Sequence, residues 1–112
     1  MSETVLGKIE SVRFGRVGYQ EAFFGIDIAF SMRGSGICGG IYGGWSVMID
    51  RSEHCKWTEA DRDRQNAEMC RKVDKILGEA GVQHVADLKG KPVEITIERG
   101  TLKDWRILTE VL

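Results

Sequence analysis

The sequence predicts one α+β domain, with an antiparallel sheet of about five strands packed against one long amphipathic helix. Three observations predict it. Side chains alternate between apolar and small or polar over residues 24–32, which is the period of a strand. Apolar residues recur every three or four positions over residues 60–80, which is the period of a helix. The elements follow one another as three strands, a helix and two strands, without a repeated strand-helix-strand unit.

Composition and length fit a single domain spanning residues 1–112. The formal net charge is -1, and nucleic-acid-binding proteins usually carry a basic excess, so the charge argues against a nucleic-acid partner. Cys38, Cys55 and Cys70 are odd in number and irregularly spaced, which predicts reduced thiols. The first residues lack a signal-peptide pattern, and no apolar run is long enough to cross a membrane. We therefore expect a cytoplasmic protein.

The first half of the chain should form three strands. Residues 7–17 predict the first strand, and residues 17–20 a turn. Residues 21–32 predict the second, and residues 33–36 a hairpin connection to a third strand within residues 37–50. Along the second strand, one face is apolar and should point into the core, and it consists of Phe24, Ile26, Ile28, Phe30 and Met32.

The third strand holds the most unusual local feature, because six of the 14 glycines lie between Gly34 and Gly44. The segment matches neither a Walker loop nor a dinucleotide fingerprint. One interpretation is that its backbone N–H groups bind an anion or nucleotide while an aromatic ring stacks on a base. The other is close backbone packing in a twisted strand. The candidate ligand-binding residues are Arg33, Gly34, Ser35, Gly36, Gly39, Gly40, Tyr42, Gly43, Gly44 and Trp45.

A loop over residues 51–57 should precede a helix over about residues 58–80. Thr58 is the expected N-cap, and Asp61 completes a capping box with it. Gly81 should end the helix in the left-handed conformation. We expect the apolar stripe to pack on the core face of the second strand, and its members are Ala60, Ala67, Cys70, Val73, Ile76, Leu77 and Ala80.

The last third of the chain predicts a short helical turn within residues 82–90 and two strands joined by a turn at Arg99 and Gly100. Val93, Ile95 and Ile97 alternate along the first of these strands. Trp105, Ile107 and Val111 should point inward from the closing strand over residues 101–112. Because this strand is apolar on both faces, it is either central or docked against another copy, and the candidate interface residues are Trp105, Arg106, Leu108 and Leu112.

The sequence shows no readable catalytic or metal-binding pattern. The two histidines, His54 and His84, lie in no nucleophile–base arrangement. His54 and Cys55 are adjacent, whereas zinc ligands are normally paired two to four residues apart. Cys70 is better explained as a small core residue. We therefore expect a protein that is not an enzyme and that uses no metal or cofactor.

The glycine-rich run GSGICGGIYGG at residues 34–44 and the block DLKGKPVE at residues 87–94 resemble small accessory proteins encoded by phages and prophages. The resemblance implies a homo-oligomeric binding protein in the host cytoplasm that inhibits a host defence protein, as anti-CRISPR proteins do. An alternative is sequestration of a cyclic nucleotide or ADP-ribose signal at the glycine-rich segment. A further alternative is a structural or assembly protein.

Overall fold

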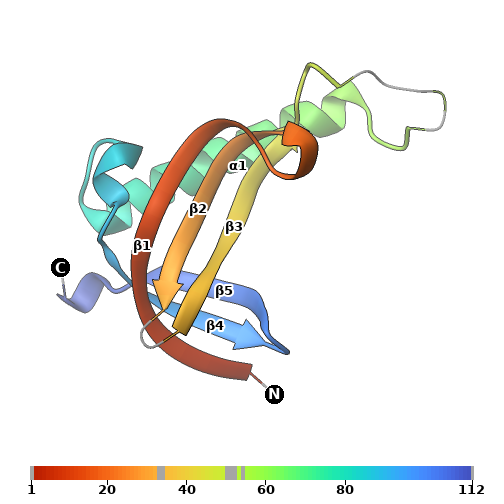
Figure 1. Cartoon of the computed structure of the whole chain (residues 1–112). Coiled ribbons are helices and arrows are strands. Elements are labelled where there is room, and N and C mark those ends of the chain that lie inside the picture. Colours follow the sequence, from red (N-terminus) through yellow and green to blue (C-terminus); the bar gives the residue numbers. More distant parts are fainter. Residues whose placement is uncertain (1, 33–34, 50–52, 54, 112) are drawn as a thin grey trace.

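The computed structural model describes residues 2–32, 35–49, 53 and 55–111, and it confirms the predicted fold class. Five strands form one antiparallel sheet, and a single α-helix packs against it (Figure 1). In the described residues, no helix is both long and apolar enough to cross a membrane. The elements are β1 (Ser2–Val17), β2 (Phe23–Met32), β3 (Ser35–Trp45), α1 (Glu59–Ala80), β4 (Pro92–Glu98) and β5 (Thr101–Ile107), with 3-10 turns at Tyr19–Glu21, Val85–Leu88 and Thr109–Val111.

The strand order is β3-β2-β1-β4-β5, so β1 is the central strand. Residues 2–8 of β1 pair with β4, and residues 7–17 pair with β2. Figure 1 shows that β1 is long and curved. β2 and β3 lie beside one part of it, and β4 and β5 cross near its N-terminal part. β1 therefore joins two halves of a curled sheet.

Glycines lie where the curled strands approach most closely. Gly15, Gly25 and Gly43 are in register across β1, β2 and β3. A Cβ atom on Gly25 would overlap the Tyr42 carbonyl oxygen and lie 2.8 Å from the Gly43 Cα. Only a residue without a side chain allows this approach, which is how glycine is used at bends in curled sheets. The second interpretation of the glycine-rich segment therefore accounts for this part of β3.

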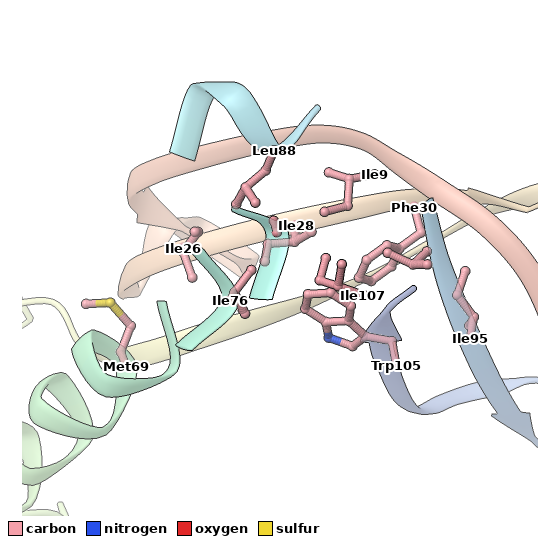
Figure 2. Packing of buried hydrophobic residues seen from close by; sticks show 12 residues of the cluster. Ile9, Ile26, Ile28, Phe30, Met69, Ile76, Leu88, Ile95, Trp105 and Ile107 are labelled. Atoms are coloured by element: carbon pink, nitrogen blue, oxygen red, sulfur yellow. The ribbon is translucent and has the colours of Figure 1, made fainter. Parts of the chain in front are cut away.

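The core lies between the helix and the concave face of the sheet. The inward orientation predicted for Ile26, Ile28 and Phe30 is confirmed, since all three are fully buried. Figure 2 shows Met69 and Ile76 of α1 pointing toward Ile26 and Ile28. Other core residues come from β1, β4, β5 and the turn before β4, and they include Ile9, Leu88, Val93, Ile95, Trp105 and Ile107.

The helix begins and ends as its sequence predicts. The Asp61 N–H donates to the Thr58 hydroxyl oxygen at 3.1 Å, and the Thr58 N–H donates to the Asp61 carboxylate at 2.8 Å, which forms the capping box. After Ala80, Gly81 adopts the left-handed conformation with φ 70°. Both predicted ends of the helix are thus confirmed.

The predicted apolar stripe is wrong in the first half of α1, because Ala60, Ala67 and Cys70 are exposed. Met69 is buried instead, and the side chains that approach β3 one turn earlier are Gln65 and Asn66. The reason is that the helix crosses β3 at Gly44, where a Cβ atom would lie only 3.0 Å from the Asn66 Oδ1. The missing side chain leaves room for polar residues, so this end of the helix needs no apolar face.

The closing strand also differs from the prediction. β5 ends at Ile107 and pairs with β4, which makes it an edge strand of the described sheet rather than a central one. Trp105 and Ile107 are buried as expected. Val111, which we expected to point inward, is 64% exposed, because the chain has by then turned into the 3-10 segment Thr109–Val111. Leu112 lies outside the described residues.

The connectivity corresponds to the OB fold, a five-stranded, partly open Greek-key barrel. Its features here are a long first strand shared by both halves of the sheet, and a helix between β3 and β4. β3 and β5 are the two edges of the sheet, and they approach one another. The open side of the barrel therefore runs between β3 and β5.

Candidate functional site

The predicted ligand-binding residues are distributed along β3 rather than gathered in one loop. A strand rises about 3.3 Å per residue, so Gly36 and Trp45 lie roughly 30 Å apart. Arg33 and Gly34 fall outside the described residues. One compact phosphate-binding loop formed by all the glycines is therefore incompatible with the fold. Instead, different parts of β3 contribute to three separate recesses. The smallest, of about 340 Å³, lies between β3 and α1 and is lined by Tyr42 and Gly43 among the predicted residues.

The first recess, here called the seam groove, lies between β3 and the hairpin of β4 and β5. Its volume is about 610 Å³. Three of the predicted residues, Gly39, Gly40 and Tyr42, line it. The other lining residues are Cys38, Ile41, Lys72 and residues 100–105.

A cation and two aromatic rings meet in the seam groove. The Lys72 Nζ lies 5.0 Å from the centre of the Tyr42 ring and 5.8 Å from that of the Trp105 ring. The Trp105 indole N–H donates to the Tyr42 hydroxyl oxygen at 2.6 Å. Burial raises the pKa of Tyr42, which keeps its phenol neutral. The groove thus offers an ammonium group to an anion beside a bare glycine backbone.

The second recess, here called the aromatic pocket, lies near the other end of β3 and has a volume of about 520 Å³. Trp45 is the predicted site residue that lines it. The other lining residues are Arg16, Phe24, Ser46, Val47, Met48 and Asn66.

The aromatic pocket adjoins a surface of exposed apolar side chains. The exposed fractions are 54% for Phe14, 38% for Phe24, 72% for Val47 and 68% for Met48. The rings of Phe14 and Phe24 meet edge to face with centroids 5.4 Å apart. Large apolar side chains gathered at one exposed place are a mark of a binding surface, whereas single ones are common.

A row of stacked rings forms the wall behind the pocket. Trp45 stacks on Phe23 with ring centroids 4.7 Å apart, and Trp57 stacks on Trp45 at 6.0 Å. The Arg62 guanidinium lies 4.6 Å from the centre of the Trp57 ring and donates to the Ser46 carbonyl oxygen at 3.2 Å. These contacts attach the segment after β3 to the helix, so Trp45 is held on both sides.

An unsatisfied acceptor lies on α1 beside the pocket, packed toward Gly44 of β3. Asn66 Oδ1 is buried and has no hydrogen-bond partner among the described residues. The same holds for Gln65 Oε1 and Arg62 Nε, one helical turn or less away. Buried polar atoms without partners are uncommon, and a group of three on adjacent turns calls for an explanation.

The sequence analysis missed most of the pocket. Phe14, Phe24 and Arg16 lie on the face of the sheet that was assigned to the core, but α1 does not cover this end of that face. Phe23 and Phe24 are neighbours in a strand and point to opposite faces, so the alternation placed Phe24 on the core face and gave no signal that it would be exposed.

Two of the candidate interface residues, Trp105 and Arg106, already make contacts within the chain. Trp105 is 8% exposed and packs on Phe30, with ring centroids 4.8 Å apart. Arg106 forms ion pairs with Glu94 and Glu110, each at 3.1 Å, and these two carboxylates raise its pKa. Within the described ranges, no three His, Cys, Asp or Glu side chains are grouped to hold a metal ion.

No family model, no curated protein and no solved structure matches the chain. The correspondence with the OB fold therefore rests on strand order and connectivity.

Proposed function

We propose that this protein binds single-stranded nucleic acid without catalysing a reaction, and that bases contact it at the aromatic pocket. The observation that carries the proposal is the exposed pair Phe14 and Phe24 beside Arg16, at one end of an OB-type sheet. OB-fold proteins bind oligonucleotides on β2, β3 and the adjoining loops. Because a fold alone does not specify a function, the proposal depends on the side chains of this site.

Aromatic rings suit single strands because every base has a π-face. Stacking of one base on a protein ring contributes about 1–3 kcal/mol, whatever the sequence. Phe24 lines the pocket, and the neighbouring Phe14 presents more than half of its side-chain surface to solvent. In duplex DNA the bases are already stacked, so the proposal implies a preference for single strands.

The small number of charged residues at the pocket predicts how such binding should depend on salt. Arg16 is the one charged residue lining the pocket among those described, and the nearby Arg13 is paired with Asp27 at 2.6 Å. Few phosphates would be neutralised, and each contributes a slope of about −0.7 to the logarithmic salt dependence for single strands. We therefore expect modest affinity with a shallow dependence on salt. The charge argument against nucleic acid applies to binding through phosphates more than to binding through stacked bases.

Fluorescence anisotropy with a labelled 20-nucleotide mixed-sequence DNA, single-stranded and as a duplex, tests the proposal. Phe14→Ala and Phe24→Ala should each weaken single-strand binding roughly 5- to 150-fold, which corresponds to the loss of one stacked base. Leu6→Ala is the matched control, since Leu6 is 50% exposed on β1 and lines neither recess. Wild-type protein that binds no single strand, or binding that both phenylalanine variants retain, would refute the proposal.

A second proposal continues the expectation that the partner is a host defence protein. The exposed apolar surface favours it, because aromatic side chains, Met and Arg are enriched in protein–protein interfaces. Co-purification from a host that carries the defence system should then recover one stoichiometric partner with the wild type and none with Phe24→Ala. Recovery of nucleic acid instead, removable by nuclease, would favour the first proposal.

The seam groove is the place to test capture of a nucleotide signal. Its glycine backbone and Lys72 support that alternative. A ligand that binds only the folded state raises the melting temperature. We expect a shift with a cyclic nucleotide or ADP-ribose that Lys72→Ala removes. No shift across a panel of such ligands would exclude this alternative.

A further inference from the structure

We infer that the free edge of β3 binds a single extended peptide as an additional strand, with an acidic side chain of the peptide beside Lys72. The seam groove and the smaller recess between β3 and α1 share no lining residue with the aromatic pocket. The inference therefore does not depend on nucleic-acid binding. It starts from the two edges of the sheet, which differ in how they are protected against pairing with another chain.

The edge formed by β5 carries the usual protection, and the edge formed by β3 does not. Lys103, Asp104 and Arg106 place charges along β5, and its register with β4 is interrupted by an irregularity. The 11 residues of β3 include no charged residue and no proline, and residues 37–45 pair with β2 without interruption. Natural sheets normally block their edges with charges, proline or bulges, because free backbone groups otherwise pair with another strand. β3 is therefore an edge that can accept a strand.

The seam groove lies along the edge of β3 rather than on one face of the sheet. Its lining includes two unbroken runs, residues 38–42 of β3 and residues 100–105 of the β4–β5 hairpin. Consecutive side chains of a strand point to opposite faces, so an unbroken run on both strands indicates a recess between their edges. Since β3 is paired only with β2, alternate residues direct backbone N–H and C=O groups toward the groove.

This space favours a single extended segment over the edge of another folded sheet. The edge of β3 forms one wall and the β4–β5 hairpin the other, so a strand placed there has this protein on both sides. A strand of another sheet would already have a neighbour on one side. The groove continues into the smaller recess as far as Gly43, and residues 38–43 span roughly 17 Å at about 3.3 Å per residue. That length fits a peptide of about six residues.

The side chains around the groove indicate what such a peptide carries. Lys72 lines both recesses, and its Nζ lies over the rings of Tyr42 and Trp105. No carboxylate of the described residues forms an ion pair with this ammonium group, although Glu68 and Asp104 line the same space. A peptide carboxylate would supply that pair as a charge-assisted hydrogen bond.

The glycines of β3 indicate the rest of the peptide. Gly39 and Gly40 present no side chain to a neighbouring strand, so large apolar side chains of the peptide have room beside them. Pairing of an edge glycine with a large ring on the next strand is a known way to stabilise a sheet. We therefore expect a peptide in which apolar and acidic residues alternate.

Selection from a phage-displayed library of random dodecapeptides tests the inference. The wild type should enrich sequences in which apolar and acidic residues alternate. A labelled synthetic peptide of the enriched sequence, titrated by fluorescence anisotropy, should bind Lys72→Glu roughly 10- to 150-fold more weakly, which corresponds to the loss of one charged hydrogen bond. The same peptide with lysine in place of its acidic residues should bind Lys72→Glu more tightly than it binds the wild type. Lys89→Glu is the matched control, since Lys89 is exposed and lines neither recess beside the β3 edge.

Pairing through the main chain has its own readout. Amide hydrogen exchange in residues 38–43 should slow when the peptide is bound, because free N–H groups of β3 acquire partners. A peptide methylated on its backbone nitrogens should not bind. Failure to enrich an alternating sequence, slowed exchange only outside β3, or equal binding of the methylated peptide would each overturn the inference. Slowed exchange in residues 38–43 with a single-stranded 20-nucleotide DNA, and with no peptide, would assign the groove to nucleic acid and overturn it as well.

Discussion

Replacement of Gly25 by alanine tests the curl of the sheet most directly. Gly25 is buried in β2, opposite Gly15 of β1 and Gly43 of β3. The new Cβ atom would overlap the Tyr42 carbonyl oxygen and lie 2.8 Å from the Gly43 Cα. Both are backbone atoms of a paired strand, which cannot rotate aside as a flexible side chain can. β3, which also contacts the helix, would have to move away from β2.

The expected loss of folding stability follows from the added methyl group. Forcing one additional methyl group into a closely packed site typically destabilises a protein by about 1–3 kcal/mol. With a denaturant slope of about 1–3 kcal/mol per molar urea, the unfolding midpoint should fall by roughly 1 M. Because a domain of this size is stable by about 5–15 kcal/mol, the variant should still fold. Urea unfolding followed by far-ultraviolet circular dichroism measures the shift.

Gly78→Ala is the matched control for this experiment. Gly78 lies exposed in α1, and a Cβ atom there would meet nothing within 4 Å. Alanine is favoured over glycine in a helix interior by about 1 kcal/mol, so this variant should be more stable than the wild type. An unchanged midpoint in Gly25→Ala, beside a raised one in Gly78→Ala, would refute the close approach of β2 and β3.

Three further predictions concern the helix start and the seam groove. Thr58→Ala removes the acceptor for the Asp61 N–H and should lower the free energy of unfolding by about 1 kcal/mol, measured as a fall in the urea midpoint. The pKa of Asp61 is lowered from its ordinary value of 3.8, chiefly by the hydrogen bond from the Thr58 backbone N–H. The stability that this carboxylate contributes is therefore present above its unfolded-state pKa and lost as the pH falls through its lower folded-state pKa, so Asp61→Asn should flatten the loss of stability below about pH 4. An equally steep acid limb in both proteins would contradict this. Tyr42→Phe leaves the Trp105 indole N–H without its acceptor and should cost about 1 kcal/mol, and an unchanged urea midpoint would show that water replaces the phenol.

Local patterns predicted the elements that depend on neighbouring residues. The period-two alternation in β2 reports which side chains share a face, and Ile26, Ile28 and Phe30 are buried on the face it indicated. The turn at Arg99 and Gly100 joins β4 and β5 as expected, with positive φ at both residues. These features are settled within a few residues of chain, so the sequence is enough to find them.

Local patterns could not show how far each face would be covered. Phe14 and Phe24 share the face of Ile26, yet they are exposed because α1 packs mainly against β3 and less against β1 and β2. Cys70 is exposed for a related reason, since the face of α1 turned toward β3 carries Asn66 and Met69 instead. The aromatic pocket is therefore a product of tertiary packing, and the sequence could predict only Trp45 among its lining residues.

The sequence by itself determined that strands, one capped helix and a glycine-rich third strand would form one antiparallel α+β structure. Only the tertiary structure decided that β1 changes partner from β4 to β2, that the sheet curls until its two edges approach, and that the seam groove and the aromatic pocket open beside β3. The physical reason is that periodicity records the direction of a side chain from its own backbone. What that side chain meets depends on segments far away in the chain.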